Sequence, residues 1–127
     1  HRFGVLNDLY LELESEGITD VNFIGVNGFQ YIDNDYSCMI CDEKCSSSTC
    51  DLGPRVLPWV QDKDFDENET GDVWDSWNAS LRDFIILDRN GIELHRINFT
   101  GYNPDPAGAG ECSGNYETIK NLILQSR

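Results

Sequence analysis

Four of the five cysteines lie in one short segment and are the residues best suited to chemistry. Two residues separate Cys38 from Cys41, three separate Cys41 from Cys45, and four separate Cys45 from Cys50. The spacing of Cys38 and Cys41 is that of a dithiol redox motif, whose first thiol is activated at a helix N-terminus directly after a strand. The strand predicted before this segment ends near Asn27, too early for that arrangement. Structural disulfides are therefore the preferred interpretation.

A thiolate metal site is the alternative use of the same cysteines. Zinc sites usually combine two separated cysteine pairs, and this cluster has no second pair. We expect no metal and no cofactor, but two disulfides among the loop cysteines or between them and Cys112, with one cysteine left over. The spacing leaves the connectivity open.

Three N-x-S/T triplets indicate a secreted, extracellular protein. They begin at Asn68, Asn78 and Asn98, and none has proline in the middle position. One such triplet arises often by chance, whereas three in a cysteine-bearing acidic chain favour the secretory pathway, in which thiols are oxidised. We expect an N-glycan on at least one of them. Asn68 lies in the middle of an acidic loop, and Asn78, beside Trp77, is expected to be the most buried.

Composition limits the partners. Nine basic residues against 23 acidic ones give a formal net charge of −14, so nucleic acid and anionic membrane surfaces would be repelled. No apolar run approaches the roughly 18 residues that a membrane span requires. The mass of 14.4 kDa predicts a single domain over residues 1–127. Because the sequence starts at His1 without an initiator methionine, we expect a processed chain or a fragment.

Other ligand patterns are incomplete. Residues 33–37 and 62–66 begin like calcium loops, but their later diagnostic positions do not fit, and we interpret both as solvated acidic loops. His1 and His95, the only two histidines, could bind copper, although His95 is better explained as a surface strand residue. The misfit positions are Cys38 and Lys44 in the first loop and Glu67 and Val73 in the second.

Hydrophobic periodicity predicts helices at both ends. Residues 3–16 form an amphipathic pattern that ends at Gly17, and a second pattern occupies the C-terminal residues. The expected inward residues are Leu6, Leu9, Tyr10 and Leu13 in the first helix and Tyr116, Ile119, Leu122 and Ile123 in the second. The expected outward residues of the first helix are Asn7, Asp8, Glu12 and Glu14.

The segments between these helices predict short strands and a crosslinked loop. Residues 21–26 read as a buried parallel strand, residues 30–55 as a cysteine-rich loop, and residues 56–61 as a strand with Pro58 at its start. A short helix should carry Val73, Trp74 and Trp77. Residues 83–88 and 92–97, joined by an Asn-Gly turn, predict a hairpin. This order favours an α/β fold of the thioredoxin kind, with flanking helices and a disulfide-rich loop insertion.

Two segments carry a resemblance to a known family. Residues 67–74 and 83–91 resemble the amino-terminal thioredoxin-like domain of selenoprotein P, and the first helix and the strand after it are also similar. The resemblance covers about two thirds of the chain and implies a cis peptide bond at Pro58. The family carries its redox pair just upstream of the first helix. This sequence begins at that helix, and its cysteine loop replaces a helical region.

We therefore expect a secreted, glycosylated thioredoxin-fold domain used for binding or assembly, without a catalytic dithiol of its own. The alternative is an extracellular thiol or selenol oxidoreductase whose active pair lies upstream of residue 1. In the thioredoxin arrangement, the strand before the first helix lies between the 21–26 and 59–61 strands. We expect a cleaved upstream peptide, a second chain or a rearranged part of this chain to fill that gap, and the leftover cysteine could bond that partner covalently. Direct pairing of the two strands is the competing possibility.

The aromatic residues allow two interpretations. They could line a pocket for a small ligand, or they could form the core between sheet and helices. The residues concerned are Trp59, Trp74, Trp77, Phe84 and Tyr102.

Overall fold

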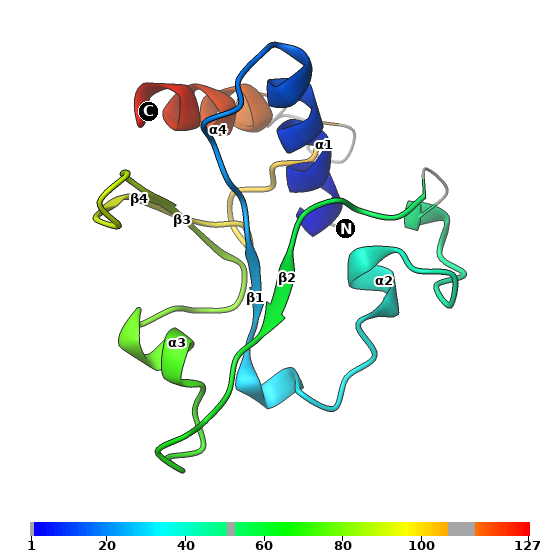
Figure 1. The fold of residues 1–127 in the computed structure, drawn as a ribbon, viewed down its shortest axis with the longest axis vertical. Coiled ribbons are helices and arrows are strands. Elements are labelled where there is room, and N and C mark those ends of the chain that lie inside the picture. The colour runs from blue at the N-terminus through cyan, green and yellow to red at the C-terminus, as the bar shows by residue number, and fades with distance from the viewer. Residues whose placement is uncertain (1, 51–52, 107–113) are drawn as a thin grey trace. The chain divides into compact units, whose positions relative to one another are not determined.

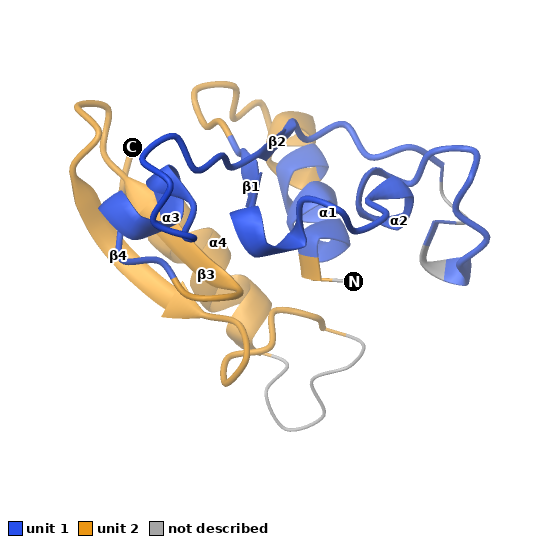
Figure 2. Ribbon diagram, turned by 90° about the horizontal axis from the view of Figure 1, so that it is seen from below, with its two compact units in different colours: residues 1, 3–11, 23–79 blue, residues 2, 12–22, 80–127 orange. Residues whose placement is uncertain are grey.

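The computed structural model describes residues 2–50, 53–106 and 114–127. Its helices and short strands are drawn in Figure 1. The chain divides into two compact units (Figure 2). Unit 1 contains residues 3–11 and 23–79, and unit 2 contains residues 2, 12–22 and 80–127. The fold is mixed α/β, and its described strands form two separate two-stranded sheets.

Unit 1 consists of most of helix α1 (Arg2–Ser15), two parallel strands and several short helices. The strands are β1 (Gly25–Asn27) and β2 (Trp59–Gln61). The short helices are η1 (Phe29–Tyr31), α2 (Ser37–Ile40), η2 (Ser48–Cys50) and α3 (Asp72–Ser76). The cysteine-rich segment, expected as an irregular loop, thus contains single helical turns.

Helix α1 agrees with the predicted span and ends as its glycine predicts. Gly17 adopts a φ of 82°, and Gly17 N–H donates to the Glu14 carbonyl at 3.0 Å. Ile18 N–H donates to the Leu13 carbonyl at 2.9 Å. These two bonds form a Schellman motif, which satisfies carbonyl groups at the end of the helix.

The outward assignment of Asn7 was wrong. Its side chain is buried, and its Oδ1 accepts the backbone N–H of Val56 at 2.8 Å and that of Leu57 at 3.4 Å. A polar residue on a helix thereby satisfies two backbone donors of the segment that leads into β2.

Strands β1 and β2 pair directly, which overturns the predicted gap. They are parallel, with Gly25 opposite Trp59 and Asn27 opposite Gln61. Gly25 N–H donates to the Pro58 carbonyl at 2.9 Å. The facing backbone groups satisfy one another, so no inserted strand from an upstream peptide or a second chain separates them.

The Leu57–Pro58 bond is trans, because the described part of the chain contains no cis peptide bond. This corrects the cis bond that the resemblance implied. Pro58 does immediately precede β2, as expected of a residue that cannot donate to the ladder. Gly25 makes room for close packing, since a Cβ there would overlap the Trp59 ring. That ring packs edge-on against Phe3, with 4.9 Å between centroids.

Unit 2 contains the predicted hairpin and the C-terminal helix. Strands β3 (Asp83–Leu87) and β4 (Glu93–Asn98) are antiparallel, with Asp83 opposite Asn98. In the connecting turn Gly91 has a φ of 79°, and Asp88 Oδ1 accepts the N–H of Asn90 and of Ile92. The Asn-Gly signal therefore identified the hairpin correctly.

Helix α4 (Gly114–Gln125) contacts the last turn of α1 within unit 2. Lys120 Nζ lies 2.5 Å from Glu12 Oε1 and 2.7 Å from Glu16 Oε1. Tyr116 Oη donates to Glu12 Oε2 at 2.6 Å. Glu12, expected to face water, is thus half-buried and is the acceptor for two residues of α4. No helix in the described ranges is long and apolar enough to cross a membrane.

Candidate functional site

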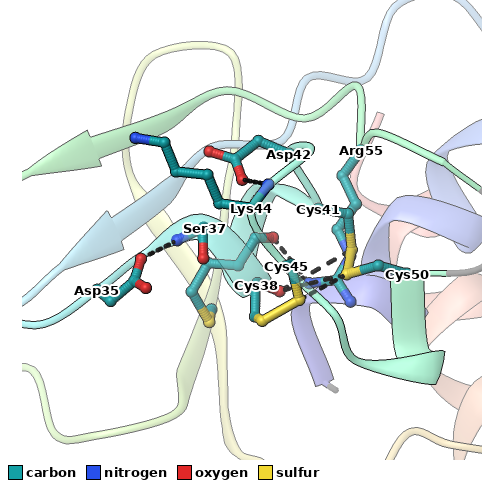
Figure 3. Close-up of a disulfide and its surroundings, with 10 residues drawn as sticks. Asp35, Ser37, Cys38, Cys41, Asp42, Lys44, Cys45, Cys50 and Arg55 are labelled. Atoms are coloured by element: carbon teal, nitrogen blue, oxygen red, sulfur yellow. Dashed lines mark hydrogen bonds between the residues drawn. A yellow bond between two sulfur atoms is a disulfide. The ribbon is translucent and has the colours of Figure 1, made fainter.

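The four loop cysteines form two disulfides, which confirms the prediction of crosslinks. Cys38 bonds to Cys45 and Cys41 bonds to Cys50, with Cα–Cα distances of 4.9 and 5.1 Å (Figure 3). Cys112 lies outside the described residues. The two bonds enclose overlapping stretches of chain, so they hold α2 and η2 together.

A short helix positions the first two cysteines. Asp35 Oδ1 accepts the N–H of Ser37 at the start of α2, at 2.8 Å. This bond lowers the pKa of Asp35. The helix ends at Ile40 and is followed by Cys41, which has a φ of 54°. A single turn of helix therefore separates the two cysteines of the redox-like spacing, and each belongs to a different disulfide.

The two disulfides touch one another. Cys50 Sγ lies 3.5 Å from Cys45 Sγ, although these atoms belong to different bonds (Figure 3). The carbonyl oxygen of Cys38 lies 3.9 Å from Cys41 Sγ and 3.9 Å from Cys50 Sγ. Cys41 is buried and Cys38 is exposed. All four sulfur atoms therefore belong to one small cluster.

Arg55 donates hydrogen bonds to the backbone of this cluster. Its Nη1 donates to the carbonyls of Cys38 at 3.2 Å and Met39 at 2.7 Å. Its backbone N–H donates to the Ile40 carbonyl at 2.9 Å. Burial lowers the pKa of Arg55, an effect that the charge of Asp8 opposes. The guanidinium satisfies carbonyl groups at the end of α2 and puts a cation beside the disulfides.

This arrangement limits the chemistry of the loop as it stands. In the disulfide form the sulfurs carry no thiolate, which both a catalytic dithiol and a zinc site need. Cys38 and Cys41 are not bonded to each other, so the oxidised form of a dithiol motif is not formed.

The three glycosylation triplets are exposed at their asparagines. Asn78, expected to be the most buried, follows the end of α3 with a φ of 46°. Asn68 donates from Nδ2 to Asp66 Oδ2 at 3.0 Å, and Thr70 donates to Asn68 Oδ1 through its N–H and its hydroxyl group.

Asn98 differs from Asn68 because its amide nitrogen makes two hydrogen bonds. It donates to the Leu81 carbonyl at 3.0 Å and to Asp83 Oδ1 at 2.8 Å. Asparagine Nδ2 carries two N–H groups. Both are used inside unit 2, to tie β4 to the start of β3.

Three carboxylates of the 62–72 loop lie close enough together to offer oxygen ligands to a cation. One oxygen from each of Asp64, Asp66 and Asp72 lies within 4.8 Å of the others. Desolvation, followed by the hydrogen bond with Asp64, raises the pKa of Asp66. Such oxygens suit a hard cation such as Ca²⁺. The loop also uses them itself: Asp64 accepts the N–H of Asn68 and Glu69. The three carboxylates alone therefore do not assign a metal.

The sequence signal for this cluster is the alternation of polar residues that starts at Asp64. Counted from there, the first, third and ninth positions of a calcium loop are the three clustered aspartates. The sixth position, glycine in such loops, is Glu69, with a φ of 68°. A calcium loop that starts at Asp62 has Glu67 and Val73 at its diagnostic positions, and it therefore does not align the three aspartates.

Asp62 has a different role from the solvated one expected. It is 3 % exposed, and its carboxylate accepts the backbone N–H groups of Lys63, Val73 and Trp74. A Cβ on Gly71 would overlap this carboxylate. Asp62 thus caps α3 from outside the helix.

Two of the aromatic residues proposed for a pocket have specific contacts within unit 1. Trp59 packs on Phe3, and Trp74 donates from Nε1 to the Val26 carbonyl at 3.3 Å. Trp74 also lines an open cavity of about 260 Å³ in unit 1. The other lining residues are Gln30, Glu69, Thr70, Gly71, Asp75, Asn78 and Ala79.

Of the two histidines, His95 lies exposed on β4 and His1 lies outside the described residues. Comparison with known proteins does not extend these assignments. No protein-family model, curated protein or solved structure matches this chain.

Proposed function

We propose that this chain is a secreted, N-glycosylated binding or assembly domain whose loop cysteines are structural crosslinks. The observation that carries the proposal is the crossed pairing of Cys38 with Cys45 and Cys41 with Cys50. A dithiol oxidoreductase cycles between two thiols and one bond within its motif. Here the two cysteines at that spacing are held in separate bonds.

Two further observations support the same proposal. The asparagines of all three acceptor triplets are exposed, as acceptors for glycans must be. The net charge of −14 disfavours anionic partners. The cavity beside Trp74, at about 260 Å³, is smaller than the roughly 300 Å³ at which small-molecule sites begin, so the proposal does not assign a small ligand to it.

The test is secretion from a eukaryotic cell behind a standard signal peptide, followed by an intact-mass measurement before and after N-glycosidase treatment. We expect the treatment to lower the mass. The matched control replaces the third residue of every triplet (Thr70→Ala, Ser80→Ala and Thr100→Ala), which retains the asparagines and should remove the shift. A native protein whose mass does not change would refute the glycoprotein assignment.

The second arm addresses catalysis. The same material should not accelerate the reduction of an insulin disulfide by a dithiol beyond the level of a cysteine-free control protein. Catalytic turnover by this chain would refute the non-catalytic assignment and leave the glycan result intact.

A further inference from the structure

We propose that the four loop cysteines form a thiol-reactive exchange site, at which an external monothiol attacks Cys38 and starts a rearrangement to the pairing Cys38–Cys41 and Cys45–Cys50. This goes beyond the proposed function, because it assigns reactivity to bonds that the function needs only as crosslinks. The substrate class is a small thiolate.

The proposal rests on the contact between the two disulfides. Cys45 Sγ and Cys50 Sγ lie 3.5 Å apart and belong to different bonds (Figure 3). Disulfides exchange by attack of a thiolate on a neighbouring sulfur. A thiolate formed on either of these atoms therefore starts in contact with its target sulfur.

Exposure determines where an external thiol enters. Cys38 is exposed, whereas Cys41, in the other disulfide, is 4 % exposed. Access to sulfur is one of the factors that set exchange rates. Attack is therefore expected at Cys38, which makes Cys45 the leaving sulfur and puts the new thiolate at the contact with Cys50.

Three exchanges then complete the rearrangement. The external thiolate bonds to Cys38 Sγ, the Cys38–Cys45 bond breaks, and Cys45 leaves as a thiolate. Cys45 attacks Cys50, the Cys41–Cys50 bond breaks, and Cys41 leaves as a thiolate. Cys41 attacks Cys38, and the external thiolate is released. Two disulfides are present before and after, so no oxidant or reductant is consumed and the external thiol is a catalyst.

The Cys38 carbonyl links Arg55 to the cluster. Its oxygen accepts a hydrogen bond from Arg55 Nη1 and lies 3.9 Å from both Cys41 Sγ and Cys50 Sγ. The hydrogen bond from the guanidinium offsets part of the negative charge of an oxygen that would otherwise repel a thiolate. The final bond joins Cys38 and Cys41 across two residues, a spacing at which disulfides are established.

The sharpest test uses single variants in a Cys112→Ser background, so that no other thiol is present. In Cys41→Ser, the thiol left on Cys50 should attack Cys45, which moves the alkylatable thiol to Cys38. In Cys38→Ser, the thiol left on Cys45 should attack Cys50, which moves the alkylatable thiol to Cys41. Both variants should contain the Cys45–Cys50 bond in peptide maps.

Cys45→Ser is the matched control, because it removes one side of the contact. It should retain Cys41–Cys50 and carry its label on Cys38. The proposal is overturned if Cys41→Ser keeps its label entirely on Cys50 and Cys38→Ser keeps its label entirely on Cys45.

A second measurement avoids any dependence on these variants. The Cys112→Ser protein is incubated with substoichiometric reduced glutathione without oxygen, quenched in acid and mapped. We expect Cys45–Cys50 and Cys38–Cys41 peptides to appear, together with a trace of glutathione on Cys38. Recovery of the starting bonds alone, at every time point, would contradict the exchange.

Discussion

The buried carboxylate of Asp62 accepts the backbone N–H of Trp74 at 2.9 Å. The residue at the N-cap position, Gly71, has no side chain that could serve this N–H. The cap of α3 is therefore supplied by the residue that directly follows β2, and it links the sheet of unit 1 to the helix that precedes the Asn78 triplet.

Replacement of Asp62 by alanine should destabilise the protein by about 1–3 kcal/mol, because two helix N–H groups would lose their acceptor away from water. The free energy of unfolding in urea measures this. Asp33→Ala is the matched control: Asp33 is exposed and its replacement removes the same charge, so we expect a change within about 0.5 kcal/mol. Equal effects of the two changes would contradict the capping role.

Asn7→Ala should also destabilise by about 1–3 kcal/mol, since Val56 and Leu57 would lose the acceptor of their N–H groups. Leu11→Ala in the same helix is the comparison, because Leu11 is 43 % exposed and contributes less packing. The free energies of unfolding of both variants in urea test this. A smaller loss for Asn7 than for Leu11 would show that these hydrogen bonds do not stabilise the fold.

The contacts of Lys120 with Glu12 predict a dependence of stability on pH at both ends of the scale. The hydrogen bond from Lys120, followed by that from Tyr116, lowers the pKa of Glu12 below its ordinary 4.5. Stabilisation from Glu12 is therefore complete above pH 4.5 and is lost as the pH falls through the folded value. Hydrogen bonds with Glu12 and Glu16 raise the pKa of Lys120 from 10.5 to about 12. Its stabilisation is complete below pH 10.5 and is lost as the pH rises toward 12.

The measurement is the difference in unfolding free energy between the native chain and Lys120→Met across pH. We expect this difference to be largest between the two limits and to shrink toward both. Lys44→Met, at an exposed position in unit 1, should show no such profile. A difference that stays constant with pH would mean that the ion pairs contribute nothing.

Glycan occupancy should be lower at Asn98 than at Asn68. N-glycosylation removes one N–H from the side-chain nitrogen, and Asn98 donates both of its N–H groups, to Leu81 and Asp83. Asn68 donates to Asp66 through a single bond, which one remaining N–H can still make. Deglycosylation in heavy-oxygen water followed by peptide mapping reports each site. Occupancy at Asn98 above that at Asn68 would contradict this ranking.

Local patterns in the sequence identified α1, the hairpin and the helix α4, because their periodicity and their turn residues act over a few positions. The start of β2 after Pro58 followed from the missing N–H of proline. The predicted cis bond and sheet gap came from a resemblance to a family. In the structure, the backbone groups of β1 and β2 instead pair with each other directly.

The remaining features depend on contacts between residues far apart in sequence. Asn7 and Asp62 look like solvent-facing residues in their own segments, and only tertiary contacts turn them into acceptors for Val56 and Trp74. The disulfide pairing was equally inaccessible, because spacing does not define connectivity. Local sequence patterns predicted neither the contact between Cys45 and Cys50 nor the close approach of three aspartates in the acidic loop.

If the loop cysteines serve as crosslinks in a secreted domain, disulfide mapping of the unreduced protein should find all four bonded. The secreted protein is alkylated at native pH without reduction, quenched in acid, digested and mapped for disulfide-linked peptides. Before any thiol is added, we expect unlabelled loop cysteines joined as Cys38–Cys45 and Cys41–Cys50. Alkylation of both Cys38 and Cys41 in this material would reveal a free dithiol and contradict the claim.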